Sequence, residues 1–163
     1  MVQNLKELNL NFSAQPAASH EDTFGVFCGA LKNLKELKNF QLNLTSCNFT
    51  ENRLIQLSKV LPNLEFLVLE CSGSSEERIS GKTVKKFVAS LVGLKNLSLI
   101  NLALRCKDID EQCAKEIFAS FWELKSLNYL RFASQVEYFD DPARTYFEEQ
   151  RLQLSKKFYC TAI

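Results

Sequence analysis

A chain of 163 residues is long enough for one domain with its own core, and its 46% hydrophobic and 24% charged residues argue against a disordered protein. Twenty basic against nineteen acidic residues leave a formal charge of +1, which makes nucleic acid an unlikely partner and disfavours anionic membranes. No segment has the length of a signal-peptide core or a membrane span. We therefore expect a soluble intracellular protein, cytoplasmic, with an organelle or a cilium as alternatives.

Five segments along the chain share one apolar spacing, two steps of three residues followed by two steps of two. The segment LKNLSLINLAL (94–104) has it most clearly, at Leu94, Leu97, Ile100, Leu102 and Leu104. The steps of three predict the end of a helix and the connection that follows it, and the steps of two predict inward positions of a strand. The other four copies are, in chain order, 2–12, 34–44, 61–71 and 124–134.

A second pattern lies between these copies, with apolar residues at i, i+3, i+4 and i+7. This spacing predicts one face of an amphipathic helix. It occurs four times, at 24–31, 54–61, 84–91 and 114–121. Each predicted strand is therefore followed by a predicted helix.

Polar residues suited to N-capping a helix recur 30 residues apart, each after an apolar residue. They are Thr50 after Phe49, Ser80 after Ile79, and Asp110 after Ile109. A period near 30 that holds one helix and one strand predicts a solenoid, in which each unit buries its apolar face against its neighbours. Right-handed crossovers would put every helix on one side. We expect an α/β fold, a short horseshoe with about five parallel strands on the concave face and helices on the convex face.

The segment LKNFQLNLTSCNF (37–49) resembles the signature L-x-x-L-x-L-x-x-C-x-L of leucine-rich repeat proteins, in the ribonuclease-inhibitor-like subclass. Its core positions are Phe40, Leu42, Leu44, Cys47 and Phe49. The segments LKNLKELKNFQLNL and ASLVGLKNLSLINLAL resemble the Lys/Asn-rich LKNLxxLxLxL variant that is expanded in some protist genomes. The resemblance covers about residues 1–134 and implies a leucine-rich-repeat solenoid. Ser74 and Lys107 stand where the signature has cysteine, so those turns need other partners.

Both ends of the solenoid need covering. The first strand has no helix before it, so we expect its edge to be covered by another chain or by further repeats. We expect residues 1–134 to form the solenoid and 135–163 a C-terminal helical cap that starts at Asp140-Asp141-Pro142. A free partner-binding helix is the alternative. The residues expected to cover the last repeat are Tyr146, Phe147, Leu152, Leu154 and Phe158.

A loop of different composition interrupts the third repeat. Its strand lies three residues earlier than a strict 30-residue period would place it. The loop that follows, CSGSSEER (71–78), is correspondingly longer, and we expect it to be exposed. This loop is either a partner contact or a tolerated surface insertion.

Side chains between the inward leucines point to the concave face, because successive strand residues alternate. Phe66, Val68, Leu99 and Tyr129 should form a contiguous apolar patch there, and such patches usually mark interfaces. The alternatives are that the C-terminal tail folds over the patch, or that large residues fill a narrow face. The predicted partner-binding residues are Phe66, Val68, Glu70, Leu99, Asn101, Tyr129 and Arg131.

The sequence offers little from which to build an active site. His20 is the only histidine, the six cysteines have no metal-ligand spacing, and no phosphate-binding glycine loop is present. We therefore predict no catalytic residues, no metal and no cofactor.

The predicted function is non-catalytic protein–protein interaction through the concave face and the edges, as an accessory or scaffold subunit of a larger intracellular assembly. The resemblance suggests, by analogy, an alternative: inhibitor-like regulatory capture of an enzyme. A third hypothesis is an enzyme that uses a buried cysteine.

Overall fold

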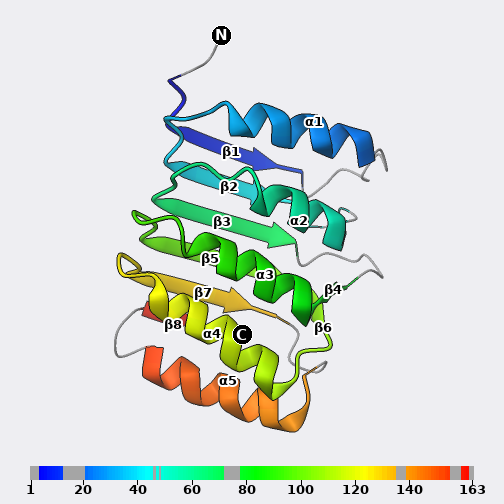
Figure 1. The fold of residues 1–163 in the computed structure, drawn as a ribbon, viewed down its shortest axis with the longest axis vertical. Helices are drawn as coiled ribbons and strands as arrows, with labels where there is room; N and C mark the ends of the chain where they lie inside the picture. The colour runs from blue at the N-terminus through cyan, green and yellow to red at the C-terminus, as the bar shows by residue number, and fades with distance from the viewer. Residues whose placement is uncertain are drawn as a thin grey trace.

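The computed structural model describes residues 4–12, 21–45, 47, 49–71, 78–134, 139–154 and 159–161. Strands and helices alternate along this part of the chain and stack in sequence order (Figure 1). The helices are α1 (Glu21–Lys32), α2 (Glu51–Ser58), α3 (Gly81–Leu91), α4 (Glu111–Glu123) and α5 (Asp141–Leu154). The main strands are β1 (Glu7–Asn11), β2 (Asn39–Asn43), β3 (Phe66–Cys71), β5 (Leu99–Leu104), β7 (Tyr129–Ala133) and β8 (Tyr159–Thr161).

These six strands form one sheet in the order β1-β2-β3-β5-β7-β8, and every adjacent pair is parallel. The predicted α/β class with parallel strands is confirmed, with one strand more than the five expected. A second, two-stranded sheet pairs β4 (Ile79–Ser80) with β6 (Cys106–Lys107). This short ladder, just before the helices, was not predicted.

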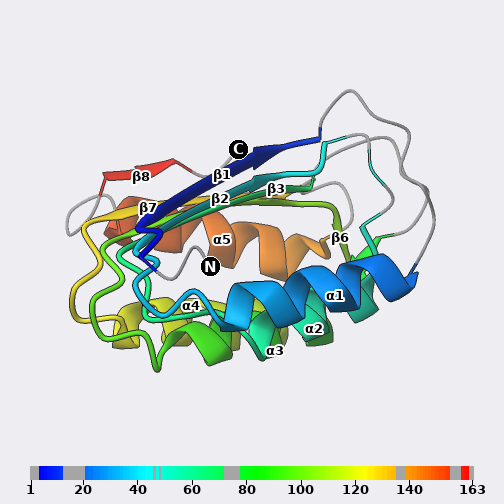
Figure 2. The same cartoon turned by 90° about the horizontal axis from the view of Figure 1, so that it is seen from above.

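All five helices lie on one face of the main sheet (Figure 2). A right-handed connection between neighbouring parallel strands returns each helix to the same side. Among the described residues, no helix covers the opposite face, which we call the open face. Any side chain that points away from the helices is therefore presented there.

The change of apolar period within each unit follows from this layering. Leu97, which lies before the strand, and the strand residues Ile100 and Leu102 are all 0% exposed. They pack in one core with the apolar face of α3, which includes Val84 and Phe87. The apolar residues spaced by three and those spaced by two are therefore buried in the same core.

The first unit is less well buried than the others. Leu8 and Leu10 are only half-buried, and Phe12, which we predicted to point inward, is 39% exposed. That prediction is wrong because β1 has a neighbour, β2, on one side only in the described sheet. Apolar side chains at the end of a stack lose half of their cover.

The predicted N-caps are confirmed. Thr50, Ser80 and Asp110 accept hydrogen bonds from backbone N–H groups three residues later, at 3.4, 3.4 and 2.7 Å. The helix start predicted at Asp140-Asp141-Pro142 is confirmed too, because α5 begins at Asp141 and Asp140 Oδ1 accepts from Ala143 N at 2.7 Å. The preceding Phe139 forms a parallel bridge with Ile109. The 30-residue recurrence therefore extends into the C-terminal segment.

Helix α5 is held by aromatic contacts. The ring of Phe147 lies 4.7 Å from Phe118, 5.1 Å from Phe139 and 5.4 Å from Phe132, measured between centroids. Leu152, which we expected to cover the last repeat, is instead 60% exposed, because it faces away from this cluster. The side chain of Leu154 and all of Phe158 lie outside the described residues. The boundary between 134 and 135 stays a prediction.

Neighbouring units also meet through polar contacts at their helix starts. Glu51, in the first turn of α2, accepts hydrogen bonds from Ser80 N at 2.7 Å and from the Thr83 hydroxyl at 2.8 Å. Burial acts to raise the pKa of Glu51, but these hydrogen bonds outweigh it and hold the pKa below its ordinary value. The charged carboxylate therefore ties α2 to the start of α3.

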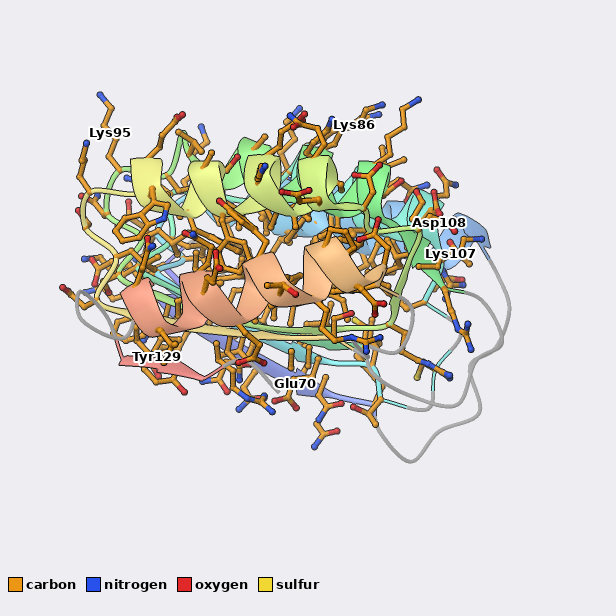
Figure 3. All side chains as sticks on the ribbon, turned by 90° about the horizontal axis from the view of Figure 1, so that it is seen from below. Glu70, Lys86, Lys95, Lys107, Asp108 and Tyr129 are labelled. Atoms are coloured by element: carbon orange, nitrogen blue, oxygen red, sulfur yellow. The ribbon has the colours of Figure 1, made fainter. Side chains whose placement is uncertain are left out.

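Gly81, the first residue of α3, fits against the next unit because it has no side chain. A Cβ there would lie 2.8 Å from the Asp108 carbonyl oxygen and 2.8 Å from Cys113 Sγ. Asp108, labelled in Figure 3, adopts a left-handed φ of 54° at this bend, which fixes the position of its carbonyl.

Replacing Gly81 by Ala should lower the free energy of unfolding by about 1 to 3 kcal/mol, because the added methyl group meets backbone that cannot easily move. Gly25, inside α1, is the control, since a Cβ there meets nothing within 4 Å. Gly25→Ala should be neutral or stabilising by up to about 1 kcal/mol. Urea unfolding measures both, and equal stability of the two variants would contradict the close contact at Gly81.

Glu51→Ala should lower the unfolding free energy at pH 7 by about 1 to 3 kcal/mol, the range for hydrogen bonds to a charged group. A carboxylate whose pKa is lowered by folding stabilises the fold above its unfolded pKa, and this contribution is lost as the pH falls through the folded value. The difference between wild type and variant should therefore shrink below about pH 4.5. Urea unfolding at several pH values between about 3 and about 7 measures this difference.

Glu111→Ala is the matched control for this experiment. Glu111 occupies the corresponding first position of α4 and pairs with Lys115 in its own helix, with both side chains 46% exposed. Such a solvent-exposed pair contributes little to stability. A loss for Glu51→Ala no larger than for Glu111→Ala would rule out the link between units.

Candidate functional site

The open face presents the predicted partner-binding residues, and the strand register determines which of them are neighbours. Phe66, Leu99 and Tyr129 are the first residues of β3, β5 and β7 and lie directly opposite one another. We call these three residues the apolar row. Phe66 is 37% exposed, and Leu99 and Tyr129 are half-buried. The row crosses three strands at the amino-terminal end of each.

Val68 also lies on the open face, two residues beyond Phe66. Its neighbours across the sheet are polar, Gln41 on β2 and Asn101 on β5. The predicted apolar patch is therefore a row of three residues with Val68 beside it. Val68 adds apolar surface next to Phe66.

Glu70 organises the polar part of the face. Its carboxylate accepts hydrogen bonds from Asn43 Nδ2 at 3.1 Å and from Asn101 Nδ2 at 3.4 Å. Arg131 donates to Asn101 Oδ1 at 3.1 Å, and its guanidinium lies 3.9 Å from Glu70 Oε1. We call Asn43, Glu70, Asn101 and Arg131 the polar network.

The polar network links strands β2, β3, β5 and β7. Each member satisfies part of the hydrogen-bonding capacity of the next, which holds these side chains in defined positions. Figure 3 shows Glu70 and Tyr129 projecting from the side of the sheet away from the helices. The apolar row and the polar network thus lie side by side on one rigid surface.

Strands β1 and β2 carry a different set of outward side chains. Asn39 donates to Glu7 at 2.9 Å, and Asn9 donates to Gln41 at 3.3 Å. These side-chain contacts link neighbouring positions of β1 and β2. The apolar part of the open face is confined to the later strands.

One predicted site residue set was incomplete. Asn43 belongs to the polar network, although the predicted partner-binding residues did not include it. The alternation of side chains along a strand could have identified it. Asn43 lies two residues after Gln41, on the same face, and opposite Glu70. An amide opposite a carboxylate is a natural hydrogen-bonding pair.

The cysteines are arranged as core side chains. Cys28, Cys47, Cys71 and Cys106 are buried free thiols, and Cys113 is partly exposed. Burial raises the pKa of Cys71 well above its ordinary value and that of Cys106 to about 12. Cys47, the residue at the signature position, donates its thiol hydrogen to the Phe12 carbonyl at 3.3 Å. Cys71 and Cys106 are therefore poor nucleophiles at neutral pH.

Two predicted features lie outside the described residues, His20 and most of the 71–78 loop. Within the part of the chain that the structure describes, no three histidine, cysteine or acidic side chains gather as they would around a metal ion. No described helix is both long and apolar enough to cross a membrane.

Comparison of the chain with protein-family models finds no matching family, and comparison with curated protein sequences finds no matching relative.

The thiols should react slowly with iodoacetamide at pH 7 in the folded protein. With a pKa of about 12, roughly one Cys106 thiol in 10⁵ is ionised at that pH. Cys113 should be modified before Cys71 and Cys106, because it is the more exposed. Peptide mass spectrometry measures the order, and urea-unfolded protein is the control in which all six cysteines react. Rapid native modification of Cys71 or Cys106 would support the cysteine-enzyme hypothesis.

Proposed function

We propose that this chain is a leucine-rich-repeat solenoid of the ribonuclease-inhibitor-like type that binds a protein partner on its open face. Five in-phase copies of the repeat spacing, parallel strands in sequence order and helices on a single face support this assignment. In such a solenoid the open face is the inner, concave surface. The chain would serve as an accessory or scaffold subunit of a larger assembly.

The single observation that carries the proposal is the apolar row. Phe66, Leu99 and Tyr129 align across three strands on a face that no described helix covers. Aromatic side chains beside an arginine are typical of the residues that dominate binding energy at protein interfaces. A partner that covers the row would remove this apolar surface from water.

The rigidity of the surface also favours binding. Main-chain pairing fixes the strands, and the polar network holds Glu70 and Arg131 in place before any partner arrives. A preformed surface binds without the cost of ordering its own side chains. Specificity would come from the polar network and affinity from the apolar row.

The double substitution Phe66→Ser and Tyr129→Ser should reduce recovery of the native partner by about tenfold or more, as expected when two hot-spot side chains are lost. The measurement is affinity capture from the native source with quantitative mass spectrometry. The matched control is Asn9→Ser with Gln41→Ser, which changes two open-face residues outside the row. Both variants should keep the wild-type melting temperature within a few degrees.

If the Phe66/Tyr129 variant captured as much of the native partner as wild type, the apolar row would not be the docking surface. Equal losses in both double variants would instead point to a general disturbance of the sheet and would also count against it. A partner that copurifies at fixed stoichiometry would support the role of an accessory subunit.

A further inference from the structure

The loops that join each helix to the next strand gather at one edge of the molecule, the left edge in Figure 1. Between the loops after α1 and α2 lies a hollow of about 310 Å³. Its lining is Lys32, Lys35, Lys59 and residues 60–63. We call this feature the basic hollow.

The three lysines of the basic hollow differ from the lysines that form ion pairs. Lys38 pairs with Glu65 at 2.5 Å, and Lys85 pairs with Glu116 at 2.6 Å. Within the described residues, no carboxylate forms an ion pair with a lysine of the hollow. The nearby Glu36 contributes to raising the pKa of Lys38, outside the hollow. The three ammonium groups are exposed and available.

The helix ends do not cancel this charge. Lys32 lies in the last turn of α1, and Lys59 follows α2, so both lie near carbonyl groups with partial negative charge. Each helix C-terminus is equivalent to roughly half a negative charge, about one for the two helices together. Against three ammonium groups, the hollow keeps about two positive charges.

The remaining lining consists of the apolar residues Val60, Leu61 and Pro62 and the polar Asn63. The volume is at the low end of the range for ligand sites, roughly 300 to 1,000 Å³. Lysines act as point charges and do not demand the planar geometry that arginine does. The site suits carboxylates carried on flexible aliphatic stems, which can pack against the apolar lining.

We propose that the basic hollow binds an acidic, glutamate-rich segment of a partner protein. Phe66 follows Asn63 by three residues, so the hollow adjoins the amino-terminal end of β3, where the apolar row begins. A partner seated on the row could reach the hollow without leaving the surface. The charge and shape of the hollow do not depend on the function of the row.

The test is a titration of ¹⁵N-labelled full-length chain with a hexaglutamate peptide at low salt, followed by NMR. The amide signals of residues 59–63, apart from Pro62, should shift and give the dissociation constant. Lys35→Gln with Lys59→Gln should raise that constant about fivefold to tenfold. The matched control is Lys82→Gln with Lys86→Gln, which removes the same charge from exposed positions on α3 and should change it less than about twofold.

Equal weakening by both variants would overturn the proposal, because it would mean that only overall charge matters. Shifts confined to other surfaces would overturn it as well. A single-stranded RNA oligonucleotide or inorganic phosphate that binds the hollow more tightly than hexaglutamate would overturn the assignment to an acidic peptide, and weaker binding would support it. The Phe66/Tyr129 variant should bind hexaglutamate like wild type, so failure at the row and failure at the hollow are told apart.

Discussion

Parallel pairing of one strand per unit, at a constant register, is the constraint on which the rest of this molecule depends. The same main-chain bond recurs from unit to unit at the entry to each strand: Lys38 N to Lys6 O, Glu65 N to Lys38 O, Ser98 N to Glu65 O, and Asn128 N to Ser98 O. One helix and one strand cannot bury their apolar faces alone, so each unit needs its neighbour to complete the core. The fixed register aligns the inward residues and brings the helix starts together. It also determines which side chains face outward.

That register separates stability from recognition. Inward positions such as Leu67 and Ile100 are 0% exposed and set the packing, whereas the outward positions beside them can change without altering it. Equivalent outward positions stack across the strands, so three substitutions at one position of three units create a row. The apolar row is one such product, and the polar network joins two outward positions, Asn43 with Glu70 and Asn101 with Arg131. The basic hollow lies beside the sheet, and its charge comes from the end of α1 and from the loops after α1 and α2, not from the strands.

The sequence predicted those features that recur at a fixed period. The strand positions and the caps Thr50, Ser80 and Asp110 all repeat, so local chemistry was sufficient to find them. Features that depend on one particular neighbour were missed. The link from Glu51 to Ser80 and Thr83 joins residues about 30 apart and has no counterpart that would reveal it as a pattern. The exposure of Phe12 and Leu152 was mispredicted because spacing says which face a residue occupies, not whether anything covers that face. Asp140 lies 30 residues after Asp110 and so continues the series of N-caps. Its place in that series was missed because the sequence around it differs from the repeat.

The unequal cover of the two described ends gives the stack a direction. Leu8 and Leu10 are half-buried on β1, whereas Leu130 and Phe132 on β7 are at most 1% exposed beneath α5 and beside β8. In a linear array, the local free energy of opening follows the number of neighbours that each unit has. Local unfolding should therefore begin at β1 and proceed toward the C-terminal units. The backbone amide protons of β5 and β7 should exchange with solvent last. A polypeptide chain that bound along β1 would stabilise this end of the stack. It would thereby also slow the local unfolding of units that it does not contact.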